Sequence, residues 1–281
     1  MILVKTSKNL QRILEKHKQN HQSIGFVPTM GALHQGHLSL IAESKNVADI
    51  TVCSIFVNPT QFNNKKDFEK YPITIEKDLD MLIGAGCDIL FLPSVKEMYP
   101  ENDTIIHYEL GYLETILEGK YRPGHFQGVC QIVDKLLNAV TPSTLFLGQK
   151  DYQQCMVIAQ MIRLCKHPTK LNICNTVREP DGLAMSSRNM RLSKAERQKA
   201  LHIITALKNV KHNLKPGNIN SLTENTSIYL QKQGFKVDYV QIADTKTLHL
   251  LEEWDGKTPV LILAAAFLNE VRLIDNLILH P

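Results

Sequence analysis

The sequence has neither a long hydrophobic run nor a region dominated by charge of one sign. Its longest apolar run, residues 260–268, is too short to span a bilayer, and the apolar start at residues 1–4 is too short for a signal peptide. We therefore expect a cytoplasmic protein with no membrane partner. The formal net charge is +4 and the lysines and arginines are scattered, so we expect no nucleic-acid partner.

Several patterns typical of other protein classes are also missing. The six cysteines form no C-x-x-C pair, and most lie in apolar stretches, which favours buried, reduced thiols. The sequence contains no G-x-x-x-x-G-K-[ST] loop and no G-x-S-x-G elbow, so P-loop kinases and serine hydrolases have no support. The composition, 43% hydrophobic and 21% charged, is that of a globular protein, and 281 residues suffice for two domains.

Apolar, strand-like runs alternate with helix-like stretches in the first part of the chain. This alternation predicts a parallel α/β sheet, with strands at residues 24–28, 50–57, 88–92, 144–147 and 171–175. An i, i+3, i+4 stripe over residues 129–140 predicts a helix packed on this sheet. A second helix is predicted at residues 73–85, where we expect the charged side chains, Asp78 among them, to face mostly solvent.

The texture changes at about residue 176, which predicts domains at residues 1–175 and 176–281. Ser193 and Glu196 form an S-x-x-E capping box, which predicts a helix over residues 194–213. A further helix is expected at residues 221–233, followed by strands at 236–242, 260–267 and 271–275. The second domain is therefore predicted to be a smaller α+β unit.

The segment P-T-M-G-A-L-H-Q-G-H at residues 28–37 follows the first strong strand. His34 and His37 stand three residues apart, and the pattern suits a strand-to-helix turn whose first amides bind phosphate. The alternative is a metal half-site or two surface histidines. Gly31 and Gly36, as turn residues, favour the phosphate site, and a nucleoside triphosphate is the natural ligand.

Two further polar segments follow predicted strands, and a third lies at the proposed domain junction. Asn58 and Gln61 in F-V-N-P-T-Q-F suit hydroxyl and carboxylate recognition, although N-P-T-Q is also an ordinary turn. Lys150 in G-Q-K-D-Y-Q-Q suits a phosphate, and Asp151 suits either ribose hydroxyls or a helix cap. The S-S-R sequence ending at Arg188 suits a polyphosphate or is an exposed loop. Together these segments indicate a nucleotide-dependent transferase or ligase.

These and other segments resemble the pantothenate synthetase family, the AMP-forming pantoate–β-alanine ligases. The similarity extends to Y-P-I-T-I-E-K-D at 71–78, Y-R-P-G-H-F-Q-G-V at 121–129, D-G-L-A-M-S-S-R-N at 181–189 and R-L-I-D-N at 272–276. The resemblance implies a Rossmann-like domain of the class I aminoacyl-tRNA synthetase and nucleotidyltransferase type, followed by a lid domain. It also implies ligation of pantoate and β-alanine through a pantoyl adenylate, and a homodimer.

The resemblance assigns roles to residues by position. It implies that the reaction uses ATP together with Mg²⁺, for which no ligands are assigned. The residues implied to hold ATP are Met30, Gly31, Ala32, Leu33, His34, Gln35, Gly36, His37, Gly148, Gln149, Lys150, Asp151, Val177, Met185, Ser186, Ser187 and Arg188. Among these, the catalytic side chains are His34, His37, Lys150 and Arg188. Gln61 and Gln154 are implied to bind pantoate, and Asn58 and Gln61 to receive β-alanine.

The sequence departs from the family pattern at two places, and two other functions compete with the ligase interpretation. Position 35 is Gln where the family commonly has Glu, and residues 268–271 replace a glycine- and threonine-containing turn, which bears on the local geometry of the lid. A nucleotidyltransferase acting on a phosphorylated cofactor precursor would share the H-x-G-H pattern. A tRNA-binding module derived from a synthetase core is the other rival, and the scattered charge argues against it.

Overall fold

The computed structural model describes residues 1–63, 65–104 and 106–280, and it divides into two compact units. The first unit comprises Met1–Gly148 and Val157–Asn175. The second comprises Gln149–Met156 and the residues from Thr176 onward. The segment 149–156, which the predicted division assigned to the first domain, thus groups with the second unit.

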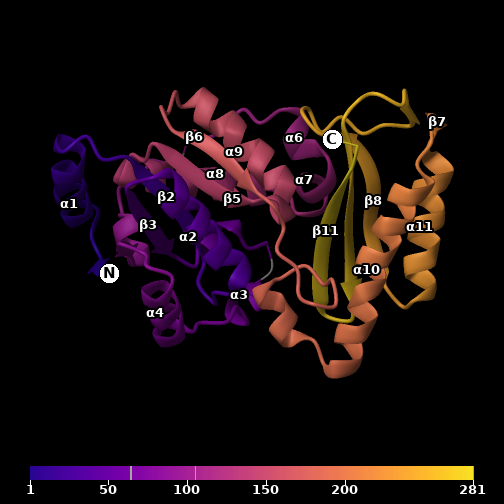
Figure 1. Cartoon of the computed structure of the whole chain (residues 1–281), viewed down its shortest axis with the longest axis horizontal. Helices are drawn as coiled ribbons and strands as arrows, with labels where there is room; N and C mark the ends of the chain where they lie inside the picture. Colours follow the sequence, from indigo (N-terminus) through magenta and orange to yellow (C-terminus); the bar gives the residue numbers. More distant parts are fainter. Residues whose placement is uncertain (64, 105, 281) are drawn as a thin grey trace. The chain divides into compact units, whose positions relative to one another are not determined.

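A six-stranded sheet forms the centre of the first unit, in the order β1-β4-β3-β2-β5-β6 (Figure 1). Every neighbouring pair is parallel. The strands are β1 (Ile2–Val4), β2 (Ile24–Thr29), β3 (Ile50–Ile55), β4 (Ile89–Phe91), β5 (Thr144–Gly148) and β6 (Lys170–Cys174). The Rossmann-like parallel sheet is therefore confirmed. The short edge strand β1 was not predicted, because three apolar residues at a terminus carry too little pattern.

The strand order places a topological switch between β2 and β5. From β2 the chain continues toward β3 and β4 on one side, whereas β5 and β6 extend the sheet on the other. Ligands of open parallel sheets bind at the carboxyl ends of strands where the order reverses. The P-T-M-G-A-L-H-Q-G-H segment follows β2 at this point, and Gly148 ends β5.

Helices cover both faces of this sheet. Val27, Cys53 and Phe146 belong to a core that includes buried residues of α2 (Gln35–Val47) and α4 (Ile75–Gly84). Because successive side chains of a strand alternate between faces, their neighbours Phe26 and Leu145 point the other way. On that side α8 (His125–Val140) packs on β2, and α1 (Ser7–Gln19) packs on α8. The predicted stripe on α8 is buried as expected.

Shorter helices and the long α9 complete the first unit. These are η1 (Pro59–Gln61), α3 (Lys65–Glu69), α5 (Val95–Met98), α6 (Tyr112–Thr115), α7 (Leu117–Tyr121) and α9 (Tyr152–Leu164), whose first five residues belong to the second unit. Five of the six cysteines are buried, as expected, and Cys165 is exposed. Within the described part of the chain, no helix is long and apolar enough to cross a membrane.

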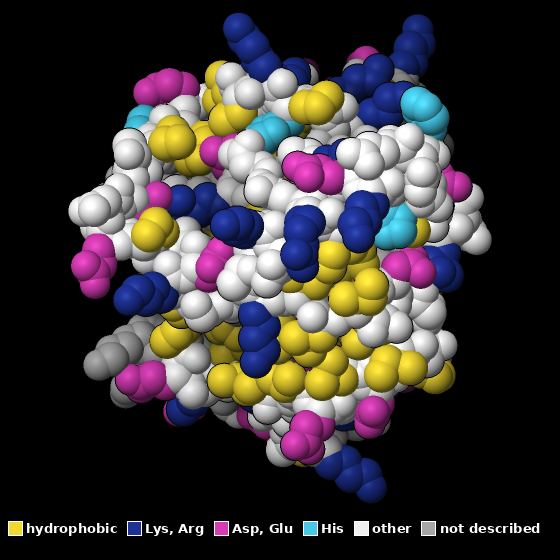
Figure 2. Space-filling model, turned by 90° about the vertical axis from the view of Figure 1, so that its left-hand side faces the viewer, with side chains coloured by type: hydrophobic (Ala, Val, Ile, Leu, Met, Phe, Trp, Pro, Cys, Tyr) yellow, Lys and Arg dark blue, Asp and Glu magenta, His cyan; other side chains and the backbone are white. Residues whose placement is uncertain are grey.

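The surface of the first unit near the N-terminus is mixed in character. In Figure 2, Lys and Arg side chains lie among acidic, neutral and hydrophobic ones, in keeping with the scattered charge of the sequence. The same view shows hydrophobic side chains gathered into patches. Met1, Ile2 and Leu3, at and beside the edge strand β1, are among the exposed large hydrophobic residues of this unit.

The second unit is an α+β layer structure. Its antiparallel sheet has the order β11-β10-β8, with β8 (Lys236–Asp244), β10 (Val260–Leu268) and β11 (Val271–His280). Helices α10 (Lys194–Asn213) and α11 (Asn220–Lys232) pack on this sheet and share its hydrophobic core (Figure 1). The remaining elements are η2 (Gln149–Asp151), η3 (Ser187–Arg191) and a small pair, β7 (Gly217–Asn218) and β9 (Glu253–Trp254).

The predicted capping box at the start of α10 is present. The Glu196 N–H donates to the Ser193 hydroxyl, and the Ser193 N–H donates to the Glu196 carboxylate at 2.8 Å. Hydrogen bonds from the Ser193 side chain, the Asn269 amide and the Ser193 backbone lower the pKa of Glu196 from 4.5 to about 2. The sequence alone therefore located this helix start correctly.

This pKa shift generates a pH prediction. Because the folded pKa lies below the unfolded one, the Glu196 carboxylate stabilises the fold above about pH 4.5, and this contribution is lost as the pH falls toward about 2. Urea unfolding followed by circular dichroism at several acidic pH values should show a shallower loss of stability for Glu196→Gln than for the unmodified chain. The exposed Glu224→Gln on α11 serves as control, and an equal effect of both variants would contradict the prediction.

Candidate functional site

The loop after β2 contains two consecutive residues in the left-handed region. Gly31 has φ +80° and Ala32 has φ +48°. The Thr29 hydroxyl accepts a hydrogen bond from the Gly31 N–H at 3.2 Å and donates to the Ser54 carbonyl at 2.8 Å. Left-handed conformations in residues other than glycine are unfavourable and persist only where the surroundings impose them. The loop is therefore held in shape by its neighbours.

Asp78 is the neighbour that imposes this shape. Its two carboxylate oxygens accept the N–H groups of Ala32 at 2.9 Å and Leu33 at 2.8 Å, and the Thr74 hydroxyl donates to it at 3.0 Å. The expectation that the charged residues of α4 face mostly solvent is wrong for Asp78, whose exposure is 0%. Helical periodicity places a side chain on one face of the helix, but it does not reveal that backbone N–H donors from another segment, here Ala32 and Leu33, lie on the buried side.

The two histidines of the H-x-G-H pattern together cap helix α2. His34 Nδ1 accepts from the Gly36 N–H at 3.2 Å, and His37 Nδ1 accepts from the His34 N–H at 3.3 Å. The ring centroids are 4.1 Å apart. An imidazole that accepts at Nδ1 carries its proton on Nε2 when neutral. Both rings therefore present an Nε2–H donor at the start of a helix that follows the switch-point strand.

This cap changes the expected source of phosphate donors. We expected backbone amides of the first helical turn, but the Gly36 N–H is used by His34 Nδ1 and the His37 N–H donates to the His34 carbonyl at 2.8 Å. The side-chain Nε2–H groups are the donors that the capping geometry defines. The helix dipole, which is positive at the N-terminus, adds to the attraction of these N–H groups for an anion.

Asn58, Gln61 and Met30 form a chain of contacts in the first unit. The Asn58 Nδ2 donates to Gln61 Oε1 at 3.1 Å, and the Gln61 Nε2 donates to the Met30 sulfur at 3.0 Å. Asn58 also donates to the Gly128 carbonyl at 3.0 Å and accepts from the hydroxyls of Tyr99 and Thr60. With exposure of 1%, its amide is fully used by the protein. The geometry makes Asn58 a positioning residue for Gln61.

The motif at residues 121–129 supports this chain from α8. A Cβ added to Gly128 would lie 2.4 Å from the Thr60 carbonyl oxygen, so only glycine permits this approach of α8 to η1. His125 Nδ1 donates to the Gln61 carbonyl at 2.8 Å, and Arg122 also contacts that oxygen. Both the backbone and the side chain of Gln61 are therefore fixed.

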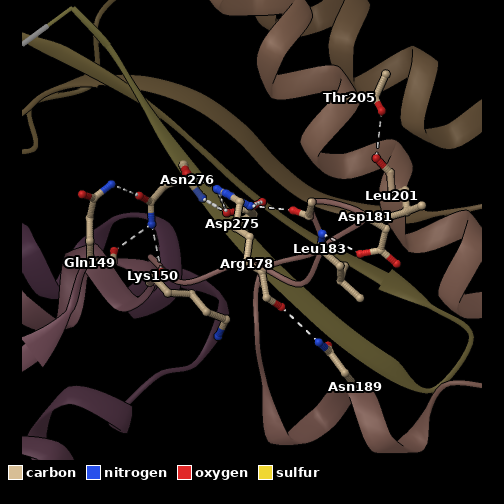
Figure 3. Close-up of polar contacts among 12 residues, drawn as sticks. Gln149, Lys150, Arg178, Asp181, Leu183, Asn189, Leu201, Thr205, Asp275 and Asn276 are labelled. Atoms are coloured by element: carbon tan, nitrogen blue, oxygen red, sulfur yellow. Dashed lines mark hydrogen bonds and ion pairs between the residues drawn. The ribbon is translucent and has the colours of Figure 1, made fainter. Parts of the chain in front are cut away.

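In the second unit, Asn276 of β11 holds the turn that contains Gln149 and Lys150. Its Nδ2 donates to the carbonyls of both residues at 2.9 Å, and its Oδ1 accepts from the Gln149 side-chain amide at 3.1 Å (Figure 3). Asn276 has an exposure of 2%. The Lys150 side chain extends away from these backbone contacts, with its ammonium 3.9 Å from Asp151 Oδ2.

Asp275, the residue before Asn276, pairs with Arg178. The guanidinium binds both carboxylate oxygens at 2.7 and 2.9 Å and also donates to the carbonyls of Gly182 and Asn276 (Figure 3). A bidentate pair of this kind fixes orientation as well as distance. The two adjacent residues of β11 thus connect the Gln149–Lys150 turn with the strand-like segment that begins at Val177.

The remaining predicted residues of the second unit line this segment and the following turn. The Val177 carbonyl accepts the Met185 N–H at 3.1 Å, and Arg178 and Ala184 form an antiparallel bridge. Ser186 caps η3 through the Arg188 N–H, Ser187 is buried and Arg188 is half-buried. Gln154 lies half-buried in the first turn of α9.

The predicted site residues thus fall into two groups, one in each unit. In the first unit Gln61 contacts both Asn58 and Met30, and His34 contacts His37. In the second unit, Gln149 and Lys150 are both bound by Asn276. Sequence reasoning assigned no site role to several supporting residues, namely Asp78, Tyr99, His125, Gly128, Arg178, Asp275 and Asn276. Most of them lie in segments that resemble the ligase family, and that resemblance was the available signal.

The Asp78 contacts predict a large effect of a small change. Asp78→Asn replaces one acceptor oxygen by an NH₂ group, which leaves the N–H of Ala32 or Leu33 without a buried acceptor. We expect a loss of about 1–3 kcal/mol in the free energy of unfolding, measured by urea denaturation. Asp80→Asn, at an exposed position of the same helix, should cost less than about 0.5 kcal/mol. Equal stabilities of the two variants would show that Asp78 does not hold the loop.

Asn276→Ala should have an effect of similar size in the second unit. The substitution removes the donors to two carbonyl groups and the acceptor of the Gln149 amide, and we expect a destabilisation of about 1–3 kcal/mol. The measurement is again urea unfolding, here with Asn213→Ala at the exposed end of α10 as control. The control should change stability by less than about 0.5 kcal/mol, and a comparably small effect of Asn276→Ala would show that Asn276 does not hold the Gln149–Lys150 turn.

Comparisons with known proteins agree with the resemblance found in the sequence. Residues 2–278 match the family model described as pantoate–β-alanine ligase. A pantothenate synthetase of Cytophaga hutchinsonii is 42% identical, with 99% of each chain covered. One from Thermotoga petrophila is 43% identical, with 99% of this chain and 100% of the relative covered.

Solved structures give the same result. A pantothenate synthetase of Thermus thermophilus superposes with a TM-score of 0.92 at 38% identity over the full length of both chains. A pantoate–β-alanine ligase of Francisella tularensis, solved with β,γ-ATP and β-alanine, has a TM-score of 0.82 at 38% identity and covers 99% of this chain and 98% of its own. The match over nearly the whole length shows that the chain belongs to the pantoate–β-alanine ligase family.

Proposed function

We propose that this chain condenses pantoate with β-alanine at the expense of ATP, through a pantoyl adenylate, and releases AMP and pyrophosphate. One observation carries the mechanism: the imidazoles of His34 and His37 cap the same helix through Nδ1, which fixes both as Nε2–H donors at the switch point of the sheet. Two fixed donors at a helix N-terminus suit the phosphates of ATP.

In the first step a pantoate carboxylate oxygen attacks the α-phosphorus of ATP. A carboxylate–phosphorus bond forms, the bond to the bridging oxygen breaks, and pyrophosphate leaves with the electron pair. Negative charge is spread over the phosphate oxygens in the transition state, so catalysis depends on donors placed around them. We assign this role to His34, His37, Lys150 and Arg188, with His37 as proton donor.

In the second step the β-alanine amine attacks the acyl carbon of the adenylate. The carbon–nitrogen bond forms, the bond between the acyl carbon and the bridging oxygen breaks, AMP leaves with that oxygen and the electron pair, and the amine loses a proton. No covalent bond to the enzyme is required. We propose that Gln61 and Gln154 bind pantoate and that Gln61 also lies beside the amine. Asn58 acts on β-alanine through the Gln61 side chain that it positions.

We propose that the loop from Met30 to His37, together with Gly148–Asp151, Val177 and Met185–Arg188, binds the nucleotide. Lys150 suits a phosphate because its carbonyl is fixed by Asn276, while its side chain extends away from that contact. Of these residues, Met30–His37 and Gly148 belong to the first unit, whereas Gln149–Asp151, Val177 and Met185–Arg188 belong to the second unit, for which we propose the role of the lid domain.

Mg²⁺ is proposed to enter with the ATP phosphates. Among the residues described, the one cluster of three potential metal ligands contains a cysteine, and thiolate is a poor ligand for a hard cation such as Mg²⁺. Asp151 is the carboxylate nearest to the proposed phosphate-binding Lys150 along the chain, but no protein ligand is assigned. A homodimer and a cytoplasmic location remain proposals, and light scattering of the purified protein tests the first.

Isolation of the first half-reaction tests the adenylate mechanism. With Mg-ATP and pantoate alone, the protein should exchange labelled pyrophosphate into ATP, because attack at the α-phosphorus is reversible while the products stay bound. Added β-alanine should give AMP and pantothenate in equal amounts. Exchange that requires β-alanine, or ADP in place of AMP, would overturn the mechanism. An adenylylated end product would support the nucleotidyltransferase instead.

Variants of His37 separate capping from catalysis. Asn places an acceptor near the position of Nδ1 but has no group at Nε2, whereas Gln places an amide N–H near Nε2. We expect His37→Asn to lower the exchange rate by about 10²-fold or more with little change in helix content, since a transition-state donor is worth a few kcal/mol. His37→Gln should recover part of the rate. Full exchange by His37→Asn would remove His37 from the catalytic residues.

A further inference from the structure

The first unit contains a cluster of three chemically different ligand groups that the proposed reaction does not use. Asp134 lies on α8, and Cys165 and His167 lie in the turn between α9 and β6. One ligand atom from each, a carboxylate oxygen, a thiol sulfur and an imidazole nitrogen, lies within 4.8 Å of the other two. His167 Nε2 and Asp134 Oδ1 are already 2.6 Å apart.

The backbone holds this turn in one conformation. At the end of α9 the N–H groups of Cys165 and His167 donate to carbonyls of the helix, and Lys166 between them has φ +55°. After Pro168, the Thr169 hydroxyl anchors the chain by donating to the Pro142 carbonyl at 2.9 Å. The Cys-x-His pair is therefore presented by a fixed turn that faces Asp134.

The carboxylate is oriented by further hydrogen bonds. The Tyr108 hydroxyl donates to Asp134 Oδ2 at 2.9 Å, and the Asn138 amide donates to Oδ1 at 3.2 Å. Such outer contacts are characteristic of protein metal sites, where they fix the direction of the ligating groups. Asp134 and His167 are both about nine-tenths buried at the side chain, whereas Cys165 is exposed and gives an ion access from solvent.

We propose that Asp134, Cys165 and His167 form a site for a borderline-soft divalent cation, Zn²⁺ in particular, with water as the fourth ligand. Zinc binds sulfur, imidazole nitrogen and carboxylate oxygen at about 2.0–2.3 Å in a tetrahedron, which places ligand atoms roughly 3.3–3.6 Å apart. To bind the ion, His167 Nε2 and Asp134 Oδ1, now 2.6 Å apart, have to separate slightly, and the exposed Cys165 side chain has to move toward them. The proposal does not rest on the proposed ligase function.

A nucleophilic Cys-His-Asp triad is the competing interpretation of the same residues. A triad needs the imidazole between sulfur and carboxylate and a thiol that ionises readily. Here the three ligand atoms instead lie within 4.8 Å of one another, so they surround a common point and do not form a line with the imidazole in the middle. A bound cation removes the thiol proton by direct coordination, so the arrangement suits a metal better than a nucleophile.

Titration of the full chain with Zn²⁺, after removal of metals by a chelator and in the presence of a phosphine reductant, tests the site. We expect one zinc ion per chain by calorimetry and a thermal unfolding midpoint that rises with zinc concentration. Cys165→Ser and His167→Gln should each weaken binding by at least about tenfold, and Tyr108→Phe by roughly tenfold, through the carboxylate it orients. His107→Gln, an exposed imidazole on the same unit, is the matched control and should bind as the unmodified chain does.

Titration with Co²⁺ identifies the ligand. A cobalt–thiolate bond gives a charge-transfer absorption band, which should appear in the unmodified chain and be lost in Cys165→Ser. Because Cys165 is exposed, this variant should fold normally, as circular dichroism will verify. Zinc isotherms that are the same for Cys165→Ser and the unmodified chain, or a cobalt spectrum without a thiolate band, would overturn the site. Neither result bears on pyrophosphate exchange, so the two proposals stand or fall separately.

Discussion

The carboxylate of Asp78 is the constraint on which the first half of the site depends. It binds two successive backbone N–H groups of a loop whose conformation is unfavourable by itself, and it does so from a position without contact to solvent. The loop in turn determines where helix α2 begins, and the beginning of α2 determines where the two imidazoles lie. A single buried charge thus sets the geometry of the two imidazoles that we propose bind phosphate.

The second unit uses the same principle with two residues. Asp275 and Asn276 are adjacent on β11, and together they hold Arg178 and the backbone of the Gln149–Lys150 turn. Breaking a buried, hydrogen-bonded ion pair leaves an uncompensated charge, and removing a buried amide leaves carbonyls without donors. Each unit therefore keeps its ligand-suited segments in place through buried polar side chains that have no direct part in the proposed chemistry.

Much of the fold follows from sequence patterns, because long buried strands and amphipathic helices have clear periodicity. Strands β2 and β5, the stripe on α8 and the capping box of α10 are examples.

What the patterns missed has a physical cause in each case. Strand β1 is too short to show alternation, and Asp78 looks like any other charge on an amphipathic helix. The grouping of residues 149–156 with the second unit depends on long-range hydrogen bonds, which local sequence does not encode. The resemblance to the ligase family supplied the site roles, whereas the fully used amide of Asn58 emerged only from its contacts.

Because His34 and His37 together cap α2, the beginning of this helix depends on which ring nitrogen of each histidine carries the proton. Each Nδ1 acts as an acceptor only while its lone pair is unprotonated. A proton on either Nδ1 turns that nitrogen into a donor that faces another donor, so the complete cap requires both rings in the tautomer with the proton on Nε2. The tautomer that caps α2 is therefore the same one that carries the Nε2–H groups to which we assign phosphate binding.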